Sequence, residues 1–141
     1  MDPLRLENQL CFPLYAAARS MVKLYTPFLN EIGLTYTQYI TMMVMWEKKS
    51  VGVKALGESL YLDSGTLTPL LKKLEQNGLV SRHRSKEDER NLIVEITEKG
   101  DSLRQRALKV PEQMRKCVTL STEDAVALYK LLNKMLDQLK N

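Results

Sequence analysis

The segment 62–97 changes from helical to strand periodicity at a glycine, and this change constrains the fold more than any other feature. Its first half has apolar residues at the spacing of one helix face: Leu67, Leu70, Leu71 and Leu74. Gly78 then ends the helix. Two short β-rich runs, 79–80 and 92–96, follow on either side of a charged loop at 85–90. A helix, a turn and a β-hairpin in this order predict a winged helix.

The polar face of the predicted helix carries short hydroxyls and amines. Thr66, Thr68, Lys72 and Lys73 can approach base edges and phosphates without burying an unpaired charge, and Ser64, Gly65 and Pro69 complete the candidate set on this helix. The hairpin adds four cations: Arg82, Arg84, Lys86 and Arg90. An extended loop can place a guanidinium in the minor groove. A single Lys or Arg is better interpreted as a solvated surface residue. The order of helix, turn and basic hairpin nevertheless favours double-stranded DNA as the partner.

Composition limits the function classes. The chain has 141 residues, 44% of them hydrophobic, which is the length of one domain. A net charge of +4 suits a polyanion but decides little alone. No apolar run is long enough to span a membrane and the start does not resemble a signal peptide, so we expect a cytoplasmic protein without a membrane partner. Two distant cysteines, Cys11 and Cys117, are expected to be thiols there. The single His83 has no neighbours at ligand spacing, so no metal or cofactor is expected.

Helical patterns flank the hairpin segment. We predict helices over 6–29, 36–48, 53–62, 98–117 and 121–139, and therefore a mainly α fold with a small β-hairpin. The winged helix-turn-helix takes 51–97. The helices in 6–30 and 98–141 exceed what it needs, so we predict that they form a dimerisation region. Alternatively they complete a monomer core, although a homodimer suits a pseudo-palindromic operator.

Pro69 conflicts with an uninterrupted helix. A proline past the first turn removes a hydrogen bond and kinks the axis. If Thr66 rather than Ser64 is the N-cap, Pro69 lies within the first turn and the conflict disappears.

Three strings carry a family resemblance. These are LENQLCFPLYAAARSM near the start, LDSGTLTPLLKKLEQNGLVSR, and the pattern DER-N-x5-T-x-x-G from Asp88 to Gly100. They resemble the MarR family of winged-helix regulators, and within it the organic-hydroperoxide repressors (OhrR) and the related SarZ and MgrA thiol regulators. The resemblance covers nearly the whole chain, which implies a single MarR-type domain over 1–141.

The resemblance implies a redox-sensing transcriptional repressor that leaves its operator when Cys11 is oxidised. Cys11 matches the reactive cysteine, which organic hydroperoxides convert to a sulfenic acid. Tyr15, Tyr25 and Tyr36 match tyrosines around that thiol, with Tyr25 and Tyr36 expected from the partner subunit. Asp88 and Arg90 match a pair in which the carboxylate holds an arginine that enters the minor groove.

The chemistry of such a site follows from general principles. A thiolate is the nucleophile toward a peroxide, and phenol donors and a helix N-terminus would favour it. Apolar neighbours of Cys11 would favour an organic peroxide. On spacing alone, however, Cys11 is better interpreted as a small core residue, and the matching tyrosines reverse that preference. Pro13 departs from the family, and we expect it to delete a hydrogen bond to the carbonyl of Gln9 and loosen the turn that holds Cys11.

Cys117 has two open interpretations. It either resolves the sulfenic acid of the partner chain as a disulfide, or it is a core residue and a low-molecular-weight thiol resolves Cys11. Other functions also remain open: a MarR-type regulator of a small aromatic ligand, or a broader thiol-based regulator of oxidative stress or virulence. A thiol peroxidase would use the same cysteine, but no peroxidase motif is present and we predict no enzyme.

Overall fold

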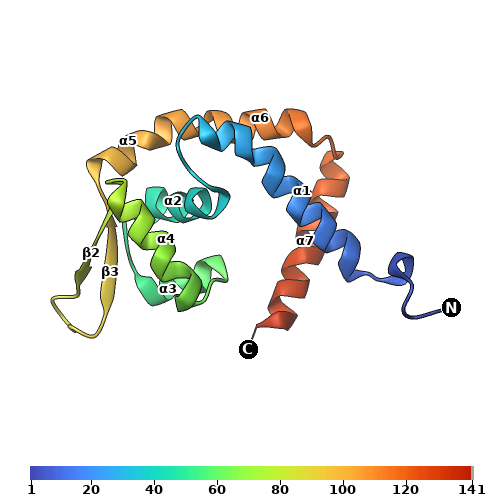
Figure 1. Ribbon diagram of the computed structural model, residues 1–141, viewed down its shortest axis with the longest axis horizontal. Helices are drawn as coiled ribbons and strands as arrows, with labels where there is room; N and C mark the ends of the chain where they lie inside the picture. The colour runs from blue at the N-terminus through green and yellow to red at the C-terminus, as the bar shows by residue number, and fades with distance from the viewer. Residues whose placement is uncertain (141) are drawn as a thin grey trace.

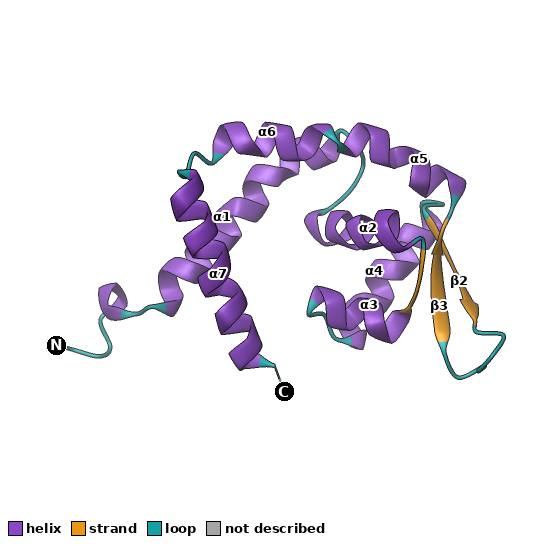
Figure 2. Ribbon diagram, turned by 180° about the vertical axis from the view of Figure 1, so that it is seen from behind, coloured by secondary structure: helices purple, strands orange, loops and turns teal. Residues whose placement is uncertain are grey.

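The computed structural model describes residues 1–140 and is mainly helical, as predicted (Figure 1). Its elements, in chain order, are η1 (Leu6–Asn8), α1 (Cys11–Asn30), α2 (Tyr36–Lys48), β1 (Ser50–Gly52), α3 (Val53–Leu60), α4 (Ser64–Gln76), β2 (Val80–Arg84), β3 (Leu92–Ile96), α5 (Glu98–Ala107), α6 (Lys109–Cys117) and α7 (Thr122–Leu139). Helices α2, α3 and α4 gather with the sheet on one side, and α1, α6 and α7 form an arm on the other (Figures 1 and 2). Helix α5 connects the two parts.

The winged helix has a leucine-rich core. Leu67, Leu71 and Leu74 on α4 are buried, and they join Leu56 of α3 and Val94 of β3 in one cluster. The helical periodicity therefore identified the inward face of α4 correctly. Gly78 ends this segment with φ +77°, a left-handed conformation that glycine adopts without strain.

The N-cap of helix α4 is a residue that the sequence did not single out. The carboxylate of Asp63 accepts a hydrogen bond from the Thr66 amide at 2.8 Å, so Asp63 is the N-cap, and neither Ser64 nor Thr66 is. Aspartate is a strong N-cap because its carboxylate also faces the positive end of the helix. Pro69 consequently lies past the first turn, inside the helix. The prediction that a later cap accommodates Pro69 is wrong, and α4 continues to Gln76 without that hydrogen bond.

The wing belongs to a three-stranded sheet rather than an isolated hairpin. The strand order is β1-β3-β2, and both pairings are antiparallel. Val94 of the central strand β3 pairs with Val51 of β1 on one side and with Arg82 of β2 on the other. The sequence did not predict β1 because three residues are too few to show strand alternation. Its pairing anchors the inner edge of the wing next to the start of α3.

Two predicted helix boundaries near the ends are wrong. Helix α1 starts at Cys11, because residues Leu6–Asn8 form a separate 3₁₀ turn and Gln9 is extended. Pro13 is therefore the third residue of α1, where its missing N–H has no helical partner, and the predicted loosening does not occur. The predicted helix 98–117 is interrupted at Leu108. Pro111 explains this break, since it cannot donate to the carbonyl of Ala107.

The T-x-x-G pattern forms the joint between the wing and α5. Thr97 caps α5 by accepting from the Gly100 amide at 3.0 Å, and its hydroxyl donates to the Gly78 carbonyl at 2.6 Å. A Cβ on Gly100 would lie 2.2 Å from the Leu79 carbonyl oxygen. The indole of Trp46 donates to the Gly100 carbonyl at 2.8 Å. A side chain larger than hydrogen at residue 100 would therefore push α5 away from the sheet.

The arm exposes apolar side chains that a stable monomer would bury. From Cys11 to Leu24, every residue of α1 except Ala16 is exposed, and α7 contains no buried residue. The large apolar side chains of these two helices that are exposed are Phe12, Leu14, Tyr15, Met21, Val22, Leu24, Val126, Leu128, Tyr129, Leu131 and Leu139. Contiguous exposed apolar surface of this kind marks an interaction face.

Candidate DNA-binding face and thiol site

Helix α4 presents all of its predicted DNA-contacting residues on one side. Ser64, Gly65, Thr66, Thr68, Pro69, Lys72 and Lys73 are exposed, whereas the four leucines of the same helix are buried. Lys72 and Lys73 form no ion pair among residues 1–140. Their ammonium groups are therefore free to meet an anionic partner. We call this surface, together with the exposed wing cations Arg84, Lys86 and Arg90, the DNA-binding face.

The wing loop is shaped by two short-range contacts. The hydroxyl of Ser85 accepts from the amides of Glu87 and Asp88, at 3.2 and 3.4 Å, and so closes the turn after β2. Asp88 then binds the Arg90 guanidinium through both carboxylate oxygens, each at 3.1 Å. These hydrogen bonds from Arg90 lower the pKa of Asp88. The Arg90 side chain is held in one orientation while it stays 90% exposed.

Arg82 does not join the exposed cations, contrary to its prediction as a DNA contact. Its side chain is only 17% exposed, and its guanidinium donates to Glu75 in the last turn of α4 at 3.1 Å. The Arg82 amide also donates to Glu75, at 3.2 Å. The neighbouring cations of the wing, Arg84 and Lys86, are exposed as expected.

One cation next to the wing was missed by the sequence interpretation. A groove of about 630 Å³ lies between the start of α3 and the base of the wing, and Lys54, Arg90 and Asn91 line it. Lys54 is distant from the wing in sequence, and no periodic signal connects it with Arg90. Only the pairing of β1 with β3 brings these residues together.

Cys11 is the first residue of α1, and it is exposed. The N-cap, Leu10, offers no side-chain acceptor, so the amides of the first turn remain available to an anion. Leu10, Phe12 and Leu14 surround Cys11 in sequence and are all exposed. The thiol therefore combines access, an electropositive helix end and apolar neighbours.

Tyr15 lies one turn after Cys11 on the same helix face, but its hydroxyl contacts Arg19 instead. The Arg19 guanidinium donates to the Tyr15 hydroxyl at 3.4 Å, and it lies 5.5 Å from the centre of the Tyr15 ring. Arg19 was not predicted. Its spacing of four residues from Tyr15 is a signal that could have identified the pair.

Tyr25 and Tyr36 form an aromatic cluster with Tyr39, well away from the thiol of the same chain. The ring centres of Tyr25 and Tyr36 are 4.9 Å apart, and those of Tyr25 and Tyr39 are 5.8 Å apart. Burial, followed by the neighbouring Tyr36, raises the pKa of Tyr25 and keeps its hydroxyl protonated as a donor. The rise along α1 from Cys11 to Tyr25 is about 21 Å, at roughly 1.5 Å per residue.

Cys117 ends α6 and is exposed, so the interpretation of this residue as part of the core is wrong. It lies at the negative end of its helix, whereas Cys11 lies at the positive end of α1. The two thiols are therefore in opposite electrostatic environments.

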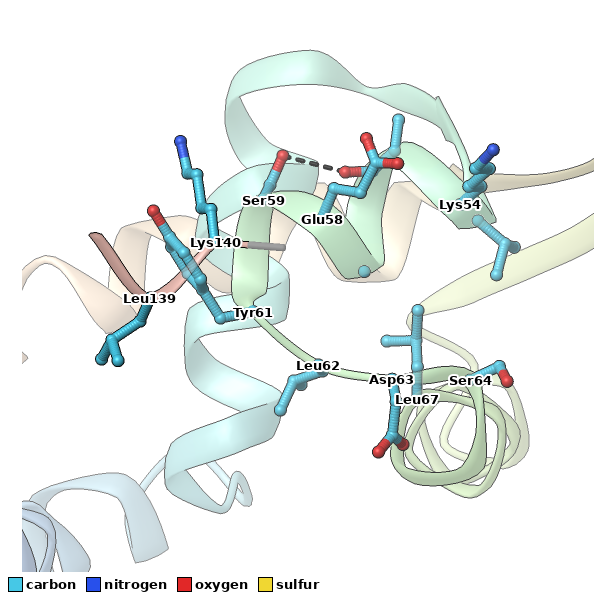
Figure 3. A pocket seen from close by; sticks show the side chains of 13 residues that line it. Lys54, Glu58, Ser59, Tyr61, Leu62, Asp63, Ser64, Leu67, Leu139 and Lys140 are labelled. Atoms are coloured by element: carbon cyan, nitrogen blue, oxygen red, sulfur yellow. Dashed lines mark hydrogen bonds between the residues drawn. The ribbon is translucent and has the colours of Figure 1, made fainter. Parts of the chain in front are cut away.

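A cavity of about 1320 Å³ separates the α3–α4 turn from the end of α7 (Figure 3). Tyr61 and Lys140 lie next to each other on one side of it, and Glu58 and Asp63 lie on the other parts of its wall. None of the predicted redox residues lines this cavity. It is thus a site separate from Cys11.

The described part of the chain contains neither a metal cluster nor a membrane-spanning helix. Within residues 1–140, no group of three or more His, Cys, Asp or Glu side chains is placed to hold a metal ion. None of the helices described combines the length and the apolar character that crossing a membrane requires.

The comparisons with known proteins agree with the fold. Residues 23–107 match the family described as "Transcriptional regulator SarA/Rot". The chain is 46% identical over 138 residues to the "Organic hydroperoxide resistance transcriptional regulator" of Bacillus subtilis, covering 98% of this chain and 94% of that one. It is also 38% identical over 133 residues to the regulator SarZ of Staphylococcus saprophyticus, covering 94% of this chain and 91% of that one. The predicted resemblance to this branch is confirmed.

Solved structures of AbfR of Staphylococcus epidermidis show the same fold in different redox states. Reduced AbfR bound to DNA superposes with a TM-score of 0.78 at 35% identity, covering 97% of this chain and 95% of that one. Disulfide-formed AbfR gives a TM-score of 0.64 at 36% identity, covering 96% of this chain and 92% of that one. Overoxidised AbfR bound to DNA gives a TM-score of 0.77 at 35% identity, so both DNA-bound forms superpose better than the disulfide form.

Proposed function

Because the chain belongs to the SarA/Rot family of transcriptional regulators, we propose that it is a homodimeric repressor whose operator affinity falls when an organic hydroperoxide oxidises Cys11. One observation carries this proposal. Cys11 is an exposed thiol at the N-terminal end of a helix, among apolar side chains, with Tyr25 and Tyr36 of its own chain too distant to reach it.

A second copy of the chain supplies what the thiol site lacks. Tyr25 lies about 21 Å along α1 from the Cys11 of its own chain, and Tyr36 packs against Tyr25. Their hydroxyls can therefore act on a thiol only if that thiol belongs to the partner. The apolar faces of α1 and α7 are exposed and need a cover. Residues 6–30 and 98–141 form the dimer interface, and 51–97 is the DNA-binding region of the single domain.

The dimer places two DNA-binding faces on a pseudo-palindromic operator. Two recognition helices fit successive major grooves when their centres are about 34 Å apart. Thr66, Thr68 and their exposed neighbours on α4 then meet base edges, while Lys72 and Lys73 meet phosphates. Arg90, fixed by Asp88, enters the adjacent minor groove.

The sensing step is a two-electron oxidation of sulfur. The Cys11 thiolate attacks the terminal oxygen of the hydroperoxide; an S–O bond forms, the O–O bond breaks, and the alkoxide leaves and takes a proton to become an alcohol. Protonated phenols, such as that of Tyr25, donate hydrogen bonds to the thiolate and to the departing oxygen. The exposed side chains of Leu10, Phe12 and Leu14 favour a peroxide with an apolar group.

The resulting sulfenic acid condenses with a second thiol and releases water. The exposed Cys117 of the partner chain is one candidate, and a low-molecular-weight thiol is the other. Either product alters the packing of α1 at the dimer interface. The two winged helices then lose the spacing that the operator requires, although each keeps its own fold.

The experiment that tests this proposal compares operator binding by the wild-type protein and by Cys11→Ser, with and without cumene hydroperoxide. Wild type should release the operator on oxidation, whereas Cys11→Ser should bind it and stay bound. Cys117→Ser is the matched control, because it removes the other exposed thiol. Peroxide-induced release by Cys11→Ser would refute the switch but not DNA binding.

A ligand-responsive regulator is the second candidate, and the cavity at the α3–α4 turn favours it. Tyr61 there adopts φ +56°, a left-handed conformation that costs energy for a non-glycine residue, and it borders the cavity beside the start of α4. A small aromatic molecule bound at this turn would move the recognition helix directly. Under that function, Cys11→Ser would respond to its effector as the wild type does.

A further inference from the structure

The pair formed by Glu75 and Arg82 holds the wing against the recognition helix. We propose that Arg82 is a positioning residue, which fixes the angle between the wing and α4, and that it does not contact DNA. This inference rests on the proposed DNA-binding function, and it assigns a role to Glu75, an acidic residue on the helix that faces DNA.

The strand register explains why Arg82 points inward. Side chains alternate across a strand, so Val80 and Arg82 of β2 lie on the same face of the sheet. Val80 is 2% exposed and belongs to the core, and Arg82 pairs across the sheet with Val94, which is fully buried. Arg82 therefore lies on the buried face of the strand, which faces α4 and where the alternation of side chains predicts an apolar residue.

Glu75 meets this inward cation from the last turn of α4. Its carboxylate receives the guanidinium at 3.1 Å and the backbone amide of Arg82 at 3.2 Å, so one side chain binds both the strand and its cation. The Arg82 hydrogen bond lowers the pKa of Glu75, and the carboxylate stays ionised near neutral pH. The Nε of Arg82 is buried and has no hydrogen-bond partner among residues 1–140, so this atom is not accessible to DNA.

The Glu75–Arg82 contact adds a polar link between two parts of the DNA-binding face, which also share the buried core around Leu74, Val80 and Val94. Arg84, Lys86 and Arg90 reach DNA from the hairpin, whereas Lys72 and Lys73 reach it from α4. The hairpin extends beyond β1, so its outer half pairs only with itself. The Glu75 carboxylate joins α4 to β2 at Arg82, in the three-stranded part of the sheet and two residues before the outer pair Arg84–Leu92. From this base it sets where Arg90 enters the minor groove.

The direction in which one substitution changes the affinity for DNA distinguishes a positioning role from simple electrostatics. Removing an acidic side chain from a DNA-facing surface should strengthen binding, because DNA repels it. If Glu75 positions the wing, Glu75→Gln should instead weaken binding to a labelled A·T-rich duplex with two half-sites, by about two- to fivefold per subunit. The matched control is Glu87→Gln, since Glu87 is an exposed wing carboxylate that forms no ion pair within residues 1–140, and this variant should bind as tightly as wild type or tighter.

Two further measurements complete the test. Arg84→Gln should reduce the slope of log affinity against log salt by about 0.9 for each phosphate that its side chain neutralises, whereas Arg82→Gln should lower affinity with the slope unchanged. Without DNA, amide hydrogen exchange across residues 80–96 should accelerate in Glu75→Gln and not in Glu87→Gln. Tighter binding by Glu75→Gln, or a reduced salt slope in Arg82→Gln, would overturn the positioning role. Accelerated exchange without DNA binding in any variant would instead mean that the proposed function has failed.

Discussion

Replacing Gly100 by alanine should destabilise the protein by about 2 kcal/mol. The added Cβ would lie 2.2 Å from the Leu79 carbonyl oxygen and 2.9 Å from Cγ1 of Ile96. Ordinary van der Waals contact begins at 3.4 Å, so α5 must move away from Leu79 by about 1.2 Å. Overpacking of this kind costs about 1–3 kcal/mol. The higher helix propensity of alanine returns at most about 1 kcal/mol, and less in the first turn, where residue 100 lies.

Urea unfolding followed by circular dichroism, at equal protomer concentrations, measures this change. With an m-value of about 2 kcal/mol/M, the midpoint should fall by about 1 M. Gly52→Ala is the matched control, because Gly52 has φ −65° and nothing lies within 4 Å of a Cβ built there. Its stability should stay within about 0.5 kcal/mol of wild type. If Gly100→Ala proves as stable as Gly52→Ala, the close approach of α5 to the sheet is not a constraint, and the reasoning fails.

Four other outcomes follow from the same structure. Arg90→Ala should weaken operator binding and lower the salt slope by about 0.9 per phosphate neutralised, measured by fluorescence anisotropy; an unchanged slope would remove Arg90 from the interface. Leu128→Glu places a charge on the exposed face of α7 and should weaken dimerisation at least about tenfold in sedimentation equilibrium, whereas a monomeric wild-type protein at micromolar concentration would contradict the dimer. After cumene hydroperoxide, non-reducing electrophoresis should show a crosslinked dimer that Cys117→Ser lacks if Cys117 resolves Cys11; a small-thiol adduct on Cys11 in the wild type would exclude Cys117. The pKa of Glu75 lies below its ordinary value of 4.5, so the stability that its carboxylate contributes is present above pH 4.5 and is lost as the pH falls through the lowered pKa. The difference in unfolding free energy between wild type and Glu75→Gln, measured by urea unfolding, should therefore shrink in acid.

The sequence predicted the parts of the fold that rest on periodicity. Leu67, Leu71 and Leu74 were identified as core because the spacing of the apolar residues is the same whichever residue is the N-cap. The cap itself was missed, since Asp63, Ser64 and Thr66 are all good N-caps and only the backbone geometry decides between them. The three-residue strand β1 was missed for a related reason: its pairing is made by a distant segment.

The candidate site shows the same division between local and long-range information. The Asp88–Arg90 pair, which the family resemblance implied, is present, and both of its residues lie in one short loop. The role of Arg82 was not predictable. Sequence shows that a strand residue is basic, but its burial depends on which face of the sheet meets α4, and its partner depends on where that helix ends. The proposed roles of Tyr25 and Tyr36 at the thiol depend on a second chain, which a single sequence does not describe.

Oxidation of Cys11, as proposed, changes the spacing of two winged helices that each stay intact. The most direct measurement is the distance between the two copies of α4 in the dimer. A ketone-bearing residue introduced at the exposed position 76 is coupled to a nitroxide, and electron paramagnetic resonance then gives the distance between the two nitroxides. Reduced protein should give a narrow distribution, which shifts by several ångströms after cumene hydroperoxide, while circular dichroism stays unchanged; Cys11→Ser should not shift. Release of the operator with an unchanged distance, or with loss of helical signal, would contradict this mechanism.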